Sequence, residues 1–177
     1  MIDVSDSMSE SASEMKDNDK EERGFSRLPL VKHALKTGVS TLSENDKMCL
    51  ITFNSKTKIE LEETNNNDIG KTKVFEKIEK MKANWNTNIW DALCLGIEVS
   101  KHFNNYSNYL MLFTDGEPNV NPPFGIVPSL KKIIIDIKNV NFTISTFAFG
   151  YRSNFQLMEE IAEIGYGIYG YCMIVPW

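Results

Sequence analysis

Short apolar runs alternate with longer amphipathic segments along most of this chain, and this alternation constrains its fold more than any other feature. Residues 48–53, 109–113 and 142–149 are apolar runs of the length expected for strands that are covered on both faces. In the segments around them, apolar residues recur at helical spacing. Strands that alternate with helices are joined by crossovers, so the sequence predicts an α/β fold with a doubly wound, mostly parallel sheet and helices on both faces.

The amphipathic segments predict five helices, at residues 27–42, 74–82, 88–100, 130–137 and 153–165. Asn88 and Ser153 stand at N-cap positions, where a side-chain oxygen accepts a backbone N–H bond. Asp91, three residues after Asn88, is expected to return a bond to the backbone of the cap. Gly165 is expected to end the last helix, which is followed by a short strand at residues 167–171.

A hairpin and a short first strand complete the predicted sheet. Residues 56–61 follow a turn and alternate polar with apolar side chains, which predicts an antiparallel edge strand. Residues 1–4 look like only the tail of a strand, so the sheet is expected to be truncated at its start. With 177 residues and 42% hydrophobic content, the chain can bury one core, and residues 1–177 are predicted to form one domain.

Charge and cysteine usage narrow the function classes. The balance of 19 basic against 24 acidic residues gives a net charge of −5, which argues against a nucleic-acid-binding surface. Cys49, Cys94 and Cys172 are odd in number and scattered, which indicates free thiols in a reducing compartment. We see no membrane span or signal peptide, so we expect a cytoplasmic location, with an extracellular one as the alternative if a signal has been lost.

A carboxylate and two hydroxyls alternate near the start of the chain, in Asp3-Val4-Ser5-Asp6-Ser7. An extended backbone would present Asp3, Ser5 and Ser7 on the same side. Small oxygen donors of this kind suit a hard cation such as Mg²⁺, with Mn²⁺ as an alternative. Because three donors do not complete an octahedron, the remaining ligands must come from elsewhere in the chain.

Two other segments offer oxygen donors at positions that can converge with Asp3. Asp115 follows the strand at residues 109–113, and Thr87 stands where a loop meets the helix that begins near Asn88. In open α/β sheets, ligands bind beyond the carboxyl ends of the strands. If the strands that end at Asp3 and Asp115 are neighbours, three separate segments supply oxygen to one point.

These motifs resemble, in order, those of the von Willebrand factor type A domain. They are Asp3-x-Ser5-x-Ser7, the segment Thr87-Asn88-Ile89-Trp90-Asp91-Ala92-Leu93, and the segment Leu112-Phe113-Thr114-Asp115-Gly116-Glu117-Pro118. The resemblance covers nearly the whole chain and implies a Rossmann-like fold. The family has a helix after its last strand, and no such helix is predicted here, so the domain is expected to be truncated at its end as well.

The resemblance implies a metal-ion-dependent adhesion site. Ser5, Ser7 and Thr87 would bind Mg²⁺ directly, and Asp3 and Asp115 would bind it through water or directly. Neutral hydroxyl ligands leave the ion under-neutralised, so an Asp or Glu side chain of a protein partner can take the open position. The implied function is therefore a non-enzymatic, Mg²⁺-dependent protein-interaction module within a larger intracellular assembly.

Loops beside this site are expected to form the rest of the partner surface. Its candidate residues are Trp85, Asp6 and Glu117, with Trp85 as an aromatic anchor. The alternatives are that Trp85 is a core residue and that Asp6 is a turn residue facing solvent. The identity of the partner and the oligomeric state are left open.

Two other function classes stay open. A metal-dependent hydrolase or phosphotransfer enzyme would use Asp3 or Asp115 as its nucleophile or base. The aspartyl phosphatase pattern needs Asp-x-Asp, however, and this chain has Asp3-x-Ser5 and no Gly-rich phosphate loop. The third alternative is a scaffold whose metal site is vestigial.

Overall fold

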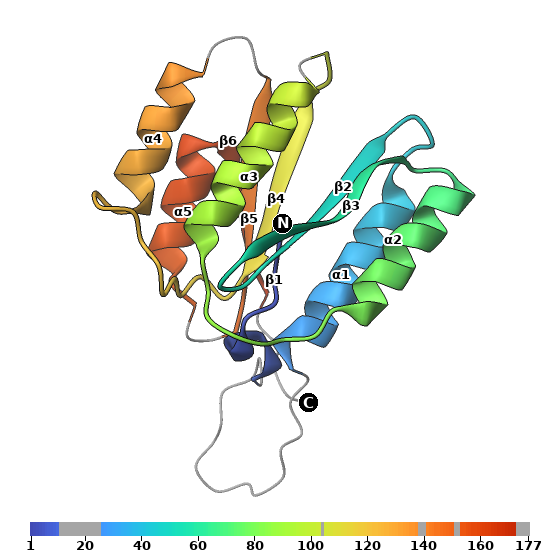
Figure 1. The fold of residues 1–177 in the computed structure, drawn as a ribbon, viewed down its shortest axis with the longest axis horizontal. Helices are drawn as coiled ribbons and strands as arrows, with labels where there is room; N and C mark the ends of the chain where they lie inside the picture. The colour runs from blue at the N-terminus through green and yellow to red at the C-terminus, as the bar shows by residue number, and fades with distance from the viewer. Residues whose placement is uncertain (11–25, 104, 138–140, 151–152, 173–177) are drawn as a thin grey trace, which may run out of the picture.

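The sheet has the predicted architecture (Figure 1). The computed structural model describes residues 1–10, 26–103, 105–137, 141–150 and 153–172. In this part of the chain, six strands form one sheet in the order β3-β2-β1-β4-β5-β6. The β2–β3 pair at the edge is antiparallel and the other neighbouring strands are parallel. The mostly parallel sheet with one antiparallel edge strand is therefore confirmed.

The strands alternate with helices as expected. The strands are β1 (Ile2–Asp3), β2 (Lys47–Phe53), β3 (Thr57–Asn65), β4 (Asn108–Thr114), β5 (Phe142–Phe149) and β6 (Tyr166–Cys172). The helices are α1 (Arg27–Thr41), α2 (Asp68–Lys80), α3 (Ile89–His102), α4 (Ile126–Asp136) and α5 (Phe155–Ile164), with a short 3-10 helix η1 (Asp6–Ser9) after β1. Residues 173–177, where no terminal helix was predicted, lie outside the described part.

Helix N-termini account for most differences from the predicted boundaries. Helix α2 begins earlier than expected because the Asn67 side chain caps it by accepting the Gly70 N–H. The prediction that Ser153 caps α5 is wrong. Asn154 is the cap, since its side chain accepts the Leu157 N–H. The Ser153 hydroxyl instead donates to the backbone carbonyls of Phe149 and Gly150 at the end of β5.

The predicted cap of α3 is correct in its first half. The Asn88 side chain accepts the Asp91 N–H at 3.1 Å. The return bond differs from the prediction, because the Asp91 carboxylate accepts the side-chain amide of Asn88 at 2.7 Å. The backbone N–H of Asn88 donates to the Asn54 carbonyl in the β2–β3 turn. This bond ties the start of α3 to the edge of the sheet.

Helices cover both faces of the sheet, as predicted. Helices α1 and α2 pack on one face in a core cluster that includes Val31, Ile78 and Phe113. Helices α3, α4 and α5 pack on the other face in a cluster that includes Leu93 and Leu112. Consecutive residues of β4 thus enter different clusters, as the period of a strand requires. No helix in the described part of the chain is long and apolar enough to cross a membrane.

The short strand β1 lies in the centre of the sheet and fixes the position of the candidate site. Asp3 pairs with Phe53 of β2, and Ile2 pairs with Phe113 of β4. Strands β1, β2 and β4 are parallel, so their carboxyl ends meet at one edge. Asp3 and Asp115 therefore leave neighbouring strands at the same edge.

Candidate metal centre

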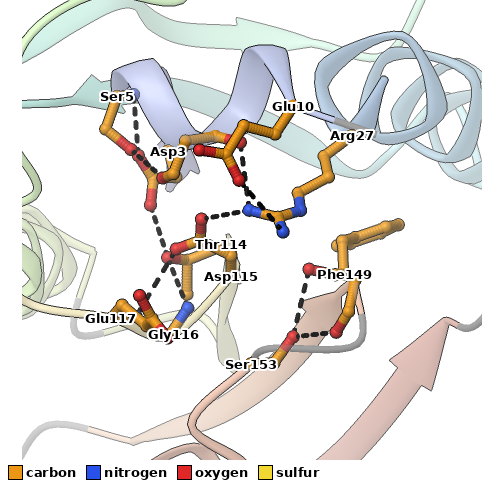
Figure 2. Close-up of polar contacts among 12 residues, drawn as sticks. Asp3, Ser5, Glu10, Arg27, Thr114, Asp115, Gly116, Glu117, Phe149 and Ser153 are labelled. Carbon is orange, nitrogen blue, oxygen red and sulfur yellow. Dashed lines mark hydrogen bonds and ion pairs between the residues drawn. The ribbon is translucent and has the colours of Figure 1, made fainter. Parts of the chain in front are cut away.

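Two buried aspartates form the centre of the site, and both were predicted. Asp3 is 0% exposed and Asp115 is 2% exposed. One carboxylate oxygen of Asp3 accepts the Ser5 N–H at 2.8 Å, and the other accepts the Thr114 hydroxyl at 2.5 Å. Thr114 in turn accepts the Gly116 N–H at 3.1 Å (Figure 2). The Asp3 carboxylate is thus held in one orientation by one group from the end of β1 and one from the end of β4.

This environment disfavours the charged form of Asp3. Burial, followed by the negative charge of Asp115, raises the pKa of Asp3 to about 7. The hydrogen bonds from Ser5 and Thr114 oppose this shift only in part. Two carboxylates held near each other in a buried place make a region where a cation is favoured.

Ser5 and Ser7 lie together, as predicted. The prediction that an extended backbone brings them together is wrong beyond Ser5. The backbone does not stay extended, because Asp6–Ser9 forms the 3-10 helix η1, which is anchored by the fully buried Met8. Within this turn the Ser5 and Ser7 hydroxyl oxygens are 3.1 Å apart and share a hydrogen bond. Ser5 is 1% exposed and Ser7 is half-buried, so this hydroxyl pair leads from the aspartates toward solvent.

The loop between α2 and α3 packs against this segment, as the prediction requires. The Asn84 N–H donates to the Val4 carbonyl, and the Asp6 N–H donates to the Trp85 carbonyl, each at 2.8 Å. These two backbone bonds join the loop to the residues that follow β1. The part of the chain that carries Thr87 is therefore fixed beside the segment that carries the two serines.

Thr87 itself is buried, with 3% exposure, and its backbone is bonded to the loop after β4. Its N–H donates to the Asn119 side-chain carbonyl at 2.8 Å, and its carbonyl accepts the Asn119 N–H at 2.9 Å. The three predicted segments thus meet through their backbones. Among the described residues, the Thr87 hydroxyl makes no hydrogen bond to the other four candidate ligands.

Arg27 is part of the site and was missed by the sequence analysis. Its side chain is 3% exposed, and its guanidinium donates through Nη1 to Asp115 Oδ2 at 2.9 Å and to the Ser7 carbonyl at 3.0 Å. Its Nη2 forms an ion pair with the Glu10 carboxylate at 3.6 Å. Figure 2 marks this contact. A signal was present, because Arg27 lies four residues before Val31 on the buried face of α1. A charged residue on an apolar helix face needs a partner.

The donor set is compatible with Mg²⁺ in its chemistry. Within the described residues, no group of three or more His, Cys, Asp and Glu side chains could hold a metal ion. The candidate set differs from such a group because three of its five members are hydroxyls. When both aspartates are ionised, Arg27 balances only one of their two negative charges. A hard divalent cation would match both the remaining charge and the oxygen donors.

The three predicted partner-surface residues all lie on the outside of the molecule. Trp85 is 69% exposed, so the alternative that it belongs to the core is wrong. Its φ of 67° is unusual for a bulky residue, which shows that the loop holds it in a strained conformation. Asp6 and Glu117 are exposed as well; Asp6 directly follows Ser5, and Glu117 is two residues after Asp115. An exposed aromatic side chain and two exposed carboxylates thus lie on the segments that carry the candidate ligands.

Comparison with known proteins agrees with this arrangement. The family model of the von Willebrand factor type A domain matches residues 1–172. The uncharacterized protein YfbK of Escherichia coli (strain K12) is 31% identical over 151 residues, which cover 82% of this chain and 25% of that protein. The uncharacterized protein sll0103 of Synechocystis is 30% identical over 145 residues, which cover 81% of this chain and 33% of that protein. The chain spans about a quarter to a third of these curated relatives.

A solved structure shares the same fold. A von Willebrand factor type A structure from Catenulispora acidiphila superposes with a TM-score of 0.79 at 17% identity. The match covers 98% of this chain and 37% of that chain. Together with the family match over residues 1–172, the sheet order and the strand-end aspartates lead to one assignment. This chain belongs to the von Willebrand factor type A family.

Proposed function

We propose that this chain is a non-enzymatic, Mg²⁺-dependent protein-interaction module. Domains of this family commonly mediate protein interactions. The observation that carries the proposal is the pair of buried aspartates, Asp3 and Asp115, flanked by hydroxyls at the carboxyl edge of the sheet. The residues that would hold the ion are Asp3, Ser5, Ser7, Thr87 and Asp115. When bound, Mg²⁺ would supply positive charge for an Asp or Glu side chain of the partner.

The protein's own residues would prepare this site in two ways. Thr114 and the Ser5 N–H orient Asp3, and Arg27 orients Asp115, so neither carboxylate is free to rotate. The direct ligands would be neutral hydroxyls, which leave most of the ion's charge available to the partner. A fixed, under-neutralised ion favours the binding of one carboxylate from outside.

The partner would also contact the exposed loops around the ion. Trp85 is the proposed anchor, because aromatic side chains contribute most to many interfaces. Asp6 and Glu117 would disfavour acidic partners that approach without a bound ion. We further propose a cytoplasmic location, which is supported by the free state of the three cysteines.

Mg²⁺ titration followed by thermal melting tests the metal part of the proposal. At about 100 times its Kd, Mg²⁺ is expected to stabilise the fold by about 2.7 kcal/mol. Ser5→Ala and Thr87→Ala should each weaken this response strongly, whereas Thr87→Ser keeps the hydroxyl and should retain it. Ser9→Ala is the matched control, since the exposed Ser9 hydroxyl bonds only the Asp6 carbonyl among the described residues. No rise in Tm, or an equal rise in all variants, would contradict metal binding.

Affinity capture tests the interaction itself. Proteins retained on the wild-type chain in Mg²⁺ should be lost in chelator and on the Ser5→Ala and Thr87→Ala variants. Retention at full strength in chelator would contradict bridging by a metal ion. The competing proposal is a phosphoester hydrolase, and Mg²⁺-dependent turnover that is abolished by Asp3→Asn would replace ours with it.

A further inference from the structure

A basic pocket of about 310 Å³ opens beside the candidate metal centre. Five lysines from the β2–β3 turn, strand β3, helix α2 and the residue two beyond it contribute to its lining: Lys56, Lys58, Lys77, Lys80 and Lys82. The chain as a whole carries a net charge of −5. Positive charge is therefore concentrated here against the overall balance of the protein.

The pocket borders two of the segments that carry the candidate metal ligands. Val4, the residue after Asp3, and Asn84 both line the pocket. The Asn84 N–H donates to the Val4 carbonyl at 2.8 Å. On the pocket side, the Asn54 side-chain amide donates to the Asn84 side chain at 2.7 Å. One wall of the pocket is thus formed by the loop between α2 and α3. This same loop carries Thr87 and is hydrogen-bonded to the segment that follows Asp3.

Of the described residues that line the pocket, one is acidic, and it does not balance the lysines. Glu60 accepts a bond from Lys58 at 2.9 Å and from the Thr52 hydroxyl at 3.2 Å, and its carboxylate lies 3.9 Å from Lys77. Lys56, Lys80 and Lys82 make no ion pair with any described residue, and all three are exposed. The pocket therefore keeps a surplus of positive charge that is available to a ligand.

The lysines are not explained by the helix dipole alone. Lys77 and Lys80 lie in the last turn of α2, where positive charge offsets the partial negative charge of the helix end. Lys56 and Lys58, in contrast, come from the β2–β3 hairpin and face the same pocket. Like charges that converge from separate elements repel each other in the absence of a counter-charge. A bound anion would relieve this repulsion.

We propose that this pocket binds an acidic segment of the protein partner, next to the single carboxylate that would reach the ion. This proposal rests on the proposed function for the identity of the ligand as a protein. The lysines are long, mobile point charges, and among the described residues no Arg or Gly-rich loop lines the pocket. This lining suits a flexible row of carboxylates better than a compact phosphate. In the part of the chain that the structure describes, no aromatic side chain lines the pocket on which a base could stack, and this disfavours single-stranded nucleic acid.

The experiment measures the binding of a fluorescein-labelled octaglutamate peptide to the full chain by fluorescence anisotropy. It is carried out at low ionic strength and in chelator, so that no divalent ion takes part. Octaglutamine is the uncharged control peptide. Octaglutamate should bind and octaglutamine should not, and the affinity should fall as salt is added. Absence of octaglutamate binding would overturn the proposal.

Two double variants locate the binding. Lys80→Gln with Lys82→Gln should weaken octaglutamate binding about fivefold, because each exposed ion pair contributes little by itself. Lys131→Gln with Lys132→Gln removes the same charge from exposed positions on α4 and should change the affinity less than about twofold. Equal weakening by both pairs would show a general charge effect and would overturn the assignment to this pocket.

Competitors and a second readout separate the alternatives. Tighter binding of an oligothymidylate, or displacement of octaglutamate by inorganic phosphate at constant ionic strength, would replace the acidic segment with one of these anions. The Lys80→Gln, Lys82→Gln variant should keep the full rise in Tm with Mg²⁺. If the wild type binds octaglutamate but shows no rise in Tm with Mg²⁺, the metal site alone is contradicted. If it shows the rise in Tm but does not bind octaglutamate, the pocket alone is contradicted.

Discussion

Replacement of Arg27 by methionine is expected to lower the free energy of unfolding by about 3–5 kcal/mol in chelator, because it leaves a buried carboxylate without its partner. Arg27 and Asp115 are 2.9 Å apart, and each side chain is 3% exposed. Asp3 lies close by and adds a second negative charge when its carboxyl is ionised. Methionine keeps much of the apolar length of the arginine, so the loss should reflect charge more than packing. Urea denaturation monitored by circular dichroism measures it.

A charge on the same helix serves as the control for this prediction. Lys36→Met removes an ion pair with Glu79 that is largely exposed, and it should cost less than about 1 kcal/mol. In Mg²⁺, the Arg27→Met variant should regain part of its stability, and its Tm should rise more than that of the wild type. A loss below about 1 kcal/mol in chelator would show that Asp115 does not depend on Arg27.

In chelator, the stability of the wild type is expected to fall as the pH rises from about 4 to about 7. The pKa of Asp3 is raised from 3.8 to about 7, so in this window the folded state keeps a proton that the unfolded state has released. Stability falls with pH wherever the folded state binds more protons, with a slope of up to about 1.4 kcal/mol per pH unit from this group. Asp115 and the hydrogen bonds from Ser5 and Thr114 act on the titrating carboxyl, and Arg27 is bonded to Asp115.

Comparison with an uncharged variant isolates this contribution. Asp3→Asn should remove the decline and should be more stable than the wild type at pH 8 in chelator. Asp6→Asn changes an exposed carboxyl beside the site and should leave the slope as in the wild type. Urea denaturation at several pH values gives the slopes. An equal slope in the wild type and in Asp3→Asn would show that Asp3 is not the group responsible.

The fold was predictable because its signals are local. Each apolar run and each helical repeat lies within one segment, and strands alternating with helices leave few topologies. Asp3 and Asp115 could be placed together for a related reason, since the carboxyl ends of neighbouring parallel strands meet at one edge. The fine choice of caps was not predictable. Ser153 and Asn154 are both good caps in neighbouring positions, and only the turn after β5 decides between them.

Arg27 was harder to find because its partner is distant in sequence. The two members of the ion pair are 88 residues apart, and they meet only when α1 packs beside the end of β4. The 3-10 turn after Ser5 has a similar origin, because the burial of Met8 decides it and not the alternation of polar residues. Sequence patterns thus identified the oxygen donors of the site but not the positively charged Arg27 that is bonded to them.

The two-residue strand β1 has a consequence for how the molecule opens. Among the described residues, Ile2 and Asp3 of β1 join β3–β2 to β4–β5–β6. One backbone bond from Val4 to β2 and one from β4 to Met1 extend this short ladder. The β2–β3 and β4–β5 pairs, in contrast, extend over many residues. The two parts of the sheet are therefore natural units of partial unfolding, with β1 as the seam between them. Asp3 lies in that seam. Any ligand held by its carboxylate would join the two units and make the sheet unfold more cooperatively.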